Sequence, residues 1–301
     1  MSLFYNFLHH KTLIIPASQG AFLHPLPYRA LALDLDGTLL DSQGKLPLRT
    51  AALLRTLAAC GLRIILASGR MTARVLPFAE QLGVPMTVVS YNGAEILEGG
   101  PSGWEVVSSR GLPDPARMAV LSLCRAHRVF LNVYAAGKLH AYHPQGDFTW
   151  SIHYEINSGA TYAGKHARLE DLPSSDISKL LVIESPRNRE RLYEQWLPLL
   201  EDLCVLTKSN PEYLEFLAKD VNKGSALKLW MDGNGILPSD LLAFGDAEND
   251  LEMLKLAGLG MAMANATPGL RAAYSRFSPW SNAQEGVAIE LGRLFNLPLD
   301  S

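Results

Sequence analysis

Four short segments of this chain place side chains of catalytic and metal-binding types where an apolar stretch ends or a helix begins. In the first, Asp34 and Asp36 directly follow the apolar residues 30–33. Alternate residues of an extended chain point to the same side, so the two carboxylates lie together and need a cation or a shared proton. Catalytic residue types recur in three further segments, LASGR at 66–70, NKGSAL at 222–227 and FGDAENDLEML at 244–254. The set predicts a magnesium-dependent phosphoryl-transfer site.

Asp34 is the candidate nucleophile of this site. A carboxylate that attacks phosphorus forms an aspartyl-phosphate and divides a difficult hydrolysis into two displacements, provided that a metal ion screens the repulsion between the two anions. Asp36 would protonate the leaving alkoxide and then take a proton from the attacking water. Gly37 allows a tight turn, and Thr38 follows it as a candidate phosphate-binding residue. A single Asp at a strand end often caps the next turn, but this account explains the whole DLDGT sequence poorly.

Asp246, Asn249 and Asp250 follow a second buried strand and bring more acidic groups to the same edge of the sheet. Four carboxylates there require a hard cation. Mg²⁺ suits best, because it binds carboxylate, carbonyl and water oxygens and leaves positions for a substrate phosphate. We predict Asp34, the backbone carbonyl of Asp36 and Asp246 as direct ligands. Asp250 and Asn249 would complete the metal site by orienting bound water and neighbouring side chains.

Several residues are predicted to bind the transferring phosphoryl group. Ser68 ends a strand, with Gly69 next to it, and can donate hydrogen bonds from its hydroxyl and its backbone. Lys223 begins a helix, where its ammonium and the helix N-terminus both stabilise negative charge. Asn249 and Asn92 are further candidates, and for Asn92 a simple turn residue is an equally good account.

The pattern from Arg29 onward indicates the α/β class. Apolar strands alternate with amphipathic helices, which is typical of a Rossmann-like parallel sheet with helices on both faces. We expect strands at 30–33, 62–67, 86–90, 241–245 and 259–263. The candidate residues then lie at the carboxyl ends of the strands, where ligands bind in open α/β sheets.

The residue pattern changes between the second segment, at 66–70, and the third, at 222–227. Polar, alternating strand-like stretches and amphipathic helices at 115–127 and 187–200 predict an inserted α+β cap domain. We assign residues 29–93 and 217–301 to the core domain and residues 94–216 to the cap. Residues 1–28 carry three prolines and no acidic residue, and we expect a disordered leader outside the fold.

Composition limits the class of protein further. The chain has 301 residues, enough for two domains, and a net charge of −3 with scattered Lys and Arg. This gives no electrostatic reason to expect nucleic acid or an anionic membrane as a partner. No apolar run approaches the roughly 20 residues of a membrane-spanning helix. The three cysteines are far apart and lack metal-ligand spacing, which favours a reduced, cytoplasmic setting.

The order and content of the four segments resemble the haloacid dehalogenase (HAD) superfamily, and within it the Cof-type phosphatases with a cap of the C2 class (C2B). The resemblance covers residues 29–301. It implies that Asp34 and Asp36 supply the nucleophile and the acid/base, and that Ser68 and Lys223 match the second and third motifs. The fourth motif matches Asp246, Asn249 and Asp250. The resemblance further implies a Mg²⁺-dependent hydrolase of small phosphorylated metabolites, often sugar phosphates.

Two other functions remain as alternatives. A phosphohexomutase of the same superfamily would keep Asp34, Asp36 and a similar cap, but would return the phosphoryl group to a sugar. A phospho-accepting signalling module would carry the phosphoryl group on Asp34 without turnover. Asp36 and the large cap argue against the signalling module, because an acid/base group accelerates dephosphorylation. The pattern identifies neither a particular substrate nor an oligomeric state.

Overall fold

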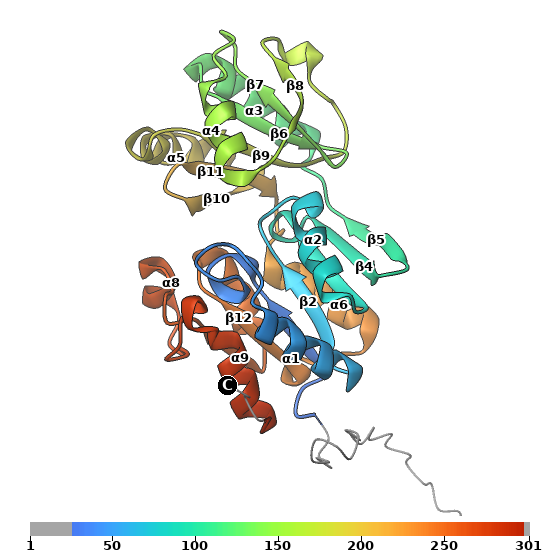
Figure 1. Cartoon of the computed structure of the whole chain (residues 1–301). Helices are drawn as coiled ribbons and strands as arrows, with labels where there is room; N and C mark the ends of the chain where they lie inside the picture. The colour runs from blue at the N-terminus through green and yellow to red at the C-terminus, as the bar shows by residue number, and fades with distance from the viewer. Residues whose placement is uncertain (1–25, 298–301) are drawn as a thin grey trace, which may run out of the picture.

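The computed structural model of the chain describes residues 26–297, apart from the side chain of Ser209. It forms two lobes, each built on one β-sheet (Figure 1). The lower lobe in this view contains a seven-stranded sheet with the order β13-β12-β1-β2-β3-β4-β5, and the upper lobe a six-stranded sheet with the order β10-β11-β9-β6-β7-β8. Within residues 26–297, no helix has both the length and the apolar character needed to cross a membrane.

The seven-stranded sheet is parallel over five strands and ends in an antiparallel hairpin. Strands β13, β12, β1, β2 and β3 run parallel, and β4 and β5 continue the sheet antiparallel to β3 and to each other. Their bounds are β1 (Ala30–Leu33), β2 (Arg63–Ala67), β3 (Met86–Ser90), β4 (Glu95–Gly100), β5 (Gly103–Ser109), β12 (Leu241–Gly245) and β13 (Leu259–Ala262).

Helices cover both faces of this sheet. Leu31 and Leu33 of β1 belong to one hydrophobic cluster, while Ala30 and Ala32 belong to another on the opposite face, as the period of two in a strand requires. The first face packs against α1 (Leu48–Ala59), α2 (Thr72–Leu82) and α9 (Gly286–Phe295). The second packs against α6 (Lys223–Asn234), α7 (Leu251–Leu256) and α8 (Pro268–Ala273). The central strands are therefore buried on both faces, and they support the residues at the edge of the sheet.

The six-stranded sheet belongs to the inserted domain and is mostly antiparallel. Its strands are β6 (Leu131–Ala135), β7 (Lys138–Tyr142), β8 (Tyr162–His166), β9 (Ile177–Ile183), β10 (Cys204–Asn210) and β11 (Tyr213–Ala218). Its helices are α3 (Asp114–His127), α4 (Thr149–Ser158) and α5 (Pro186–Leu200). Short helical turns in the two lobes are η1 (Leu35–Leu39), η2 (Tyr91–Gly93), η3 (Leu169–Asp171), η4 (Pro238–Asp240), η5 (Glu248–Asp250) and η6 (Asn282–Gln284).

The two faces of the cap sheet have different roles. One face packs against α3 and α5 around the fully buried Trp196. The other face carries Tyr134 and Leu181 in a cluster that also includes Tyr91 from the core domain. This second face is therefore the one that contacts the core domain.

The structure confirms the α/β class and corrects the expected domain boundaries. Residues 94–109, assigned from sequence to the cap, form the β4–β5 hairpin of the core sheet, because Glu95–Gly100 pairs with β3. The return boundary expected at 217 falls inside β11, which belongs to the cap sheet. Most of the expected leader, residues 1–25, lies outside the described residues. Leu26 and Tyr28, which were assigned to it, pack against the core cluster.

The local elements match the sequence expectation closely. The strands expected at 30–33, 86–90 and 241–245 are confirmed with the same bounds. The acidic segment after β12 forms the turn η5 and then the helix α7, which places Asp250 at a helix start.

The burial of β1 leads to a direct test of the core. Leu33 is fully buried, whereas Leu48 at the start of α1 is 80% exposed. We expect Leu33→Ala to lower the free energy of unfolding by about 2–5 kcal/mol, because it leaves a cavity in the core. The matched variant Leu48→Ala should change it by less than about 0.5 kcal/mol. Urea denaturation measures both, and equal losses would contradict the buried position of Leu33.

Candidate active site

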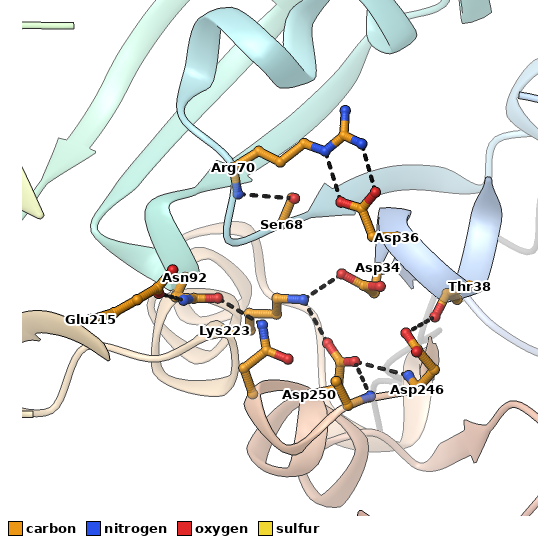
Figure 2. Close-up of polar contacts among 12 residues, drawn as sticks. Asp34, Asp36, Thr38, Ser68, Arg70, Asn92, Glu215, Lys223, Asp246 and Asp250 are labelled. Atoms are coloured by element: carbon orange, nitrogen blue, oxygen red, sulfur yellow. Dashed lines mark hydrogen bonds and ion pairs between the residues drawn. The ribbon is translucent and has the colours of Figure 1, made fainter. Parts of the chain in front are cut away.

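The candidate residues gather at the carboxyl edge of the parallel strands (Figure 2). Asp34 follows β1, Ser68 follows β2 and Asp246 follows β12. Lys223 begins α6, so its side chain reaches the same edge from the opposite side of the site. The parallel arrangement of β1, β2 and β12 thus brings together residues that lie more than 200 positions apart in sequence.

Lys223 lies at the centre of the site. Its ammonium donates to Asp34 Oδ1 at 2.5 Å and to Asp250 Oδ1 at 2.6 Å. The Lys223 and Asp250 residues are fully buried, and Asp34 is 5% exposed. An unpaired charge would be very costly at this depth, so the three groups depend on one another for their ionised forms.

Asp246 is held beside this group by backbone and hydroxyl contacts. Asp250 Oδ2 accepts hydrogen bonds from the backbone N–H groups of Asp246 and Ala247, at 2.9 and 3.0 Å. The Thr38 hydroxyl donates to Asp246 Oδ1 at 3.0 Å. Thr38, predicted as a phosphate-binding residue, is therefore engaged with a carboxylate in this structure.

The electrostatics of the cluster favour added positive charge. Burial and the charge of Asp250 raise the pKa of Asp34 well above its ordinary value, although Lys223 acts in the opposite direction. Burial and Asp250 likewise raise the pKa of Asp246 to about 6. Burial lowers the pKa of Lys223, but the charges of Asp250 and Asp34 outweigh it and raise the pKa above its ordinary value. Lys223 is thus a fixed cation at neutral pH.

Three of these carboxylates are close enough to share one metal ion. Oxygen atoms of Asp34, Asp246 and Asp250 lie within 4.8 Å of one another. Three carboxylates against the single ammonium of Lys223 leave two negative charges when all are ionised. An all-oxygen donor set with this surplus charge fits Mg²⁺, which binds through carboxylates and retains positions for water and phosphate.

Asp36 faces a different partner from Asp34. Arg70 Nε donates to Asp36 Oδ2 at 2.7 Å and Arg70 Nη2 donates to Asp36 Oδ1 at 2.6 Å, a two-pronged pair that fixes the carboxylate plane. The Asp36 side chain is 57% exposed, in contrast to the buried Asp34. Arg70 directly follows Ser68 and Gly69, but it is not among the site residues predicted from sequence.

The remaining predicted residues form the wall of the site next to β2 and β3. The Ser68 hydroxyl accepts a hydrogen bond from the Arg70 backbone N–H at 3.1 Å. Asn92 is almost fully buried and has φ +56, a left-handed conformation that Asn tolerates better than most residues. Its side-chain oxygen accepts a hydrogen bond from Asn249 Nδ2 at 2.9 Å. A Cβ on Gly69 would lie 2.9 Å from this same oxygen, so a larger residue there would have to displace the Asn92 amide.

A cleft of about 450 Å³ lies over these residues, between the core domain and the cap. Its core side includes Asp34, Asp36, Ser68 and Asp246. Its cap side is lined by residues that the sequence analysis did not identify, among them Tyr154, Asn157, Lys179, Tyr213 and Glu215. Lys179 and Glu215 carried a sequence signal, because each is an isolated charge inside an otherwise apolar strand.

Comparison with known proteins assigns the family. A profile of the haloacid dehalogenase-like hydrolases matches residues 31–291. The chain therefore belongs to this family, as the order of its four motifs implied. Its fold and the α+β cap place it with the Cof-type members.

Two named relatives and one crystal structure illustrate the match. An HMP-PP phosphatase of Enterobacter is 30% identical over 253 residues, which are 82% of this chain and 88% of that protein. A 5-amino-6-(5-phospho-D-ribitylamino)uracil phosphatase of Bacillus subtilis is 25% identical over 295 residues, 89% of this chain and 98% of that protein. A haloacid dehalogenase-like hydrolase from Bacteroides thetaiotaomicron aligns with TM-score 0.77 at 25% identity, over 89% of this chain and 100% of that chain. The chain is a phosphatase hydrolase of this family.

Gly37 gives a test of the site geometry that is separate from its charges. A Cβ at Gly37 would lie 2.2 Å from Asp246 Oδ2, whereas a Cβ at Gly44 would meet no atom within 4 Å, and both residues have positive φ. Gly37→Ala should therefore displace Asp246 and lower kcat by roughly 100-fold, the scale expected for an error of about 1 Å. Gly44→Ala carries the same backbone strain and should retain activity. Similar kcat values for the two variants would contradict the close approach of Gly37 to Asp246.

Proposed function

We propose that this protein is a Mg²⁺-dependent phosphatase that hydrolyses small phosphorylated metabolites through an aspartyl-phosphate on Asp34. The observation that carries the proposal is the juxtaposition of Asp34 with Lys223 and two further carboxylates at one strand edge. A buried carboxylate beside a fixed cation is suited to attack phosphorus, because the cation offsets the charge that accumulates in the transition state.

Each predicted residue has a role in this mechanism. Asp34 attacks the phosphorus atom, and Asp36, at the exposed mouth of the site, gives a proton to the leaving alkoxide and later takes one from water. Ser68 and Lys223 donate hydrogen bonds to the phosphoryl oxygens, with Gly69 and Thr38 shaping the loops around them. Asn92 and Asn249 hold the far wall of the phosphate site.

Mg²⁺ would be held by Asp34, the backbone carbonyl of Asp36 and Asp246. When bound, it supplies charge neutralisation that lets two anions approach one another. Asp250 would orient these ligands instead of binding the metal, because both its oxygens are already hydrogen-bonded to Lys223 and to backbone N–H groups. Asn249 has the same orienting role through its contact with Asn92.

The substrate is proposed to be a sugar phosphate or a similar phosphate monoester. A cleft of about 450 Å³ suits a small molecule better than a polymer. The two phosphatases compared above are named for small phosphorylated compounds, which supports this size class.

We further propose a cytoplasmic location, with no nucleic acid or membrane as partner, since the three cysteines are free thiols and the net charge is small.

A phosphohexomutase remains the second candidate function, because it would use Asp34, Asp36 and a closing cap in the same way. The two activities differ in the acceptor of the phosphoryl group, which is water in one and a sugar in the other. A phospho-accepting signalling module is disfavoured by the exposed Asp36 at the mouth and by the cap over the cleft.

The charge cluster leads to a direct test of the proposed chemistry. We expect wild-type protein to release inorganic phosphate from a panel of sugar phosphates, nucleotides and phosphorylated cofactors in Mg²⁺, and to lose this activity in EDTA. Asp34→Asn is nearly isosteric and should lower kcat by at least about 10⁴-fold, because it removes the nucleophile. Thermal unfolding of the variant checks that it remains folded.

The outcome also separates the alternatives. Phosphate release by Asp34→Asn at the wild-type rate would exclude Asp34 as the nucleophile. Isomer formation from a hexose phosphate only in the presence of a sugar bisphosphate would instead identify a mutase. A phosphorylated protein that persists for hours would favour the signalling module.

A further inference from the structure

The cap contributes a buried ion pair to the wall of the cleft. Lys179 of β9 and Glu215 of β11 are each 3% exposed, and Lys179 Nζ lies 3.0 Å from Glu215 Oε1. They lie on the face of the cap sheet that contacts the core domain, among apolar neighbours such as Leu181 and Leu217. Two charges on a mostly apolar inner face need a reason beyond packing, because burial removes the hydration of both.

Two hydrogen bonds and one aromatic contact hold the Lys179 ammonium inside the protein. One hydrogen bond goes to Glu215 and a second, 3.0 Å long, goes to the backbone carbonyl of Gly69 in the loop that follows β2. The ammonium also lies 4.9 Å from the centre of the Tyr134 ring, which it faces as a cation–π contact. Lys179 is therefore placed to hold the Gly69 loop.

Glu215 continues this connection into the core domain. Its Oε2 accepts a hydrogen bond from Asn92 Nδ2 at 2.8 Å, and Asn92 Oδ1 accepts one from Asn249 Nδ2 at 2.9 Å. Asn249 stands between Asp246 and Asp250 in the acidic loop. Figure 2 shows this row of side chains running from Glu215 past Asn92 toward the carboxylate cluster. A continuous line of hydrogen bonds thus joins the cap to the metal-binding loop.

We propose that the Lys179–Glu215 pair positions the cap relative to the core domain and fixes the acidic loop through Asn92 and Asn249. The proposal rests on the proposed Mg²⁺-dependent phosphatase function. A buried ion pair adds little net stability compared with apolar residues of the same volume, so what it contributes is a defined arrangement of the groups bonded to it. Apolar side chains at both positions would fill the space but would leave the Gly69 carbonyl and Asn92 without these partners.

The test compares stability with metal binding and turnover in three variants. Lys179→Met and Glu215→Met each leave one buried charge unpaired and should lower Tm by roughly 6 °C or more. The double variant Lys179→Met/Glu215→Met removes both charges and should return Tm to within about 2 °C of wild type. Its kcat on p-nitrophenyl phosphate should nevertheless fall by roughly 10- to 100-fold, and its Mg²⁺ dissociation constant from calorimetry should rise by a similar factor.

The cap offers a matched control pair. Lys165 and Glu155 form an ion pair at 3.3 Å with both side chains about one-third exposed, and neither lines the cleft. The double variant Lys165→Met/Glu155→Met should keep the wild-type Tm, kcat and Mg²⁺ dissociation constant, because exposed pairs contribute little.

Two outcomes would overturn the positioning role. The first is a stable Lys179→Met/Glu215→Met variant with wild-type kcat and Mg²⁺ dissociation constant. The second is a loss of kcat that follows Tm alone across all variants, which is the behaviour of a purely structural pair. If wild-type protein binds Mg²⁺ but releases no phosphate, the proposed phosphatase function fails, and the calorimetric comparison still decides the role of the pair.

Discussion

The excess of negative charge around the buried Lys223 is the constraint that the rest of the fold must satisfy. Asp34, Asp246 and Asp250 lie within 4.8 Å of one another, and one ammonium offsets only part of their charge. Such a cluster is costly to bury, which is why the pKa of Asp34 and that of Asp246 are raised. The same surplus charge is what the proposed Mg²⁺ would neutralise, so the raised pKa values and the proposed chemistry have one physical cause.

The rest of the fold can be understood as the support for this cluster. Parallel strands β1 and β12 deliver Asp34 and Asp246 to one edge, and helices on both faces keep the strands fully buried. Gly37 lets the loop after β1 approach Asp246 more closely than any side chain would allow. The cap then covers the cleft, which lowers the local dielectric constant and strengthens each charge interaction inside it.

The sequence predicted the parts of the structure that depend on local pattern. The carboxylates Asp34 and Asp246 were placed correctly because each directly follows an apolar strand, and strand ends in parallel sheets meet at one edge. The hairpin at 94–109 was assigned to the wrong domain, because no local signal tells which sheet a strand will join. The helix α4 was missed because Ser151 is its only buried residue, so it lacks the apolar face by which a core helix is recognised. The contacts of Lys179 and Glu215 with the core were missed because they depend on how the cap sheet lies on the core.

Isothermal titration calorimetry of Mg²⁺ binding, in two buffers of different ionisation enthalpy near pH 6.5, tests the central role of the charge cluster most directly. The account predicts one Mg²⁺ per chain and a release of protons, because the raised pKa values of Asp34 and Asp246 leave the metal-free cluster partly protonated. Asp246→Asn should bind at least about 10-fold more weakly. An absence of Mg²⁺ binding in wild type, binding to wild type without proton release, or equally tight binding by Asp246→Asn would contradict this account.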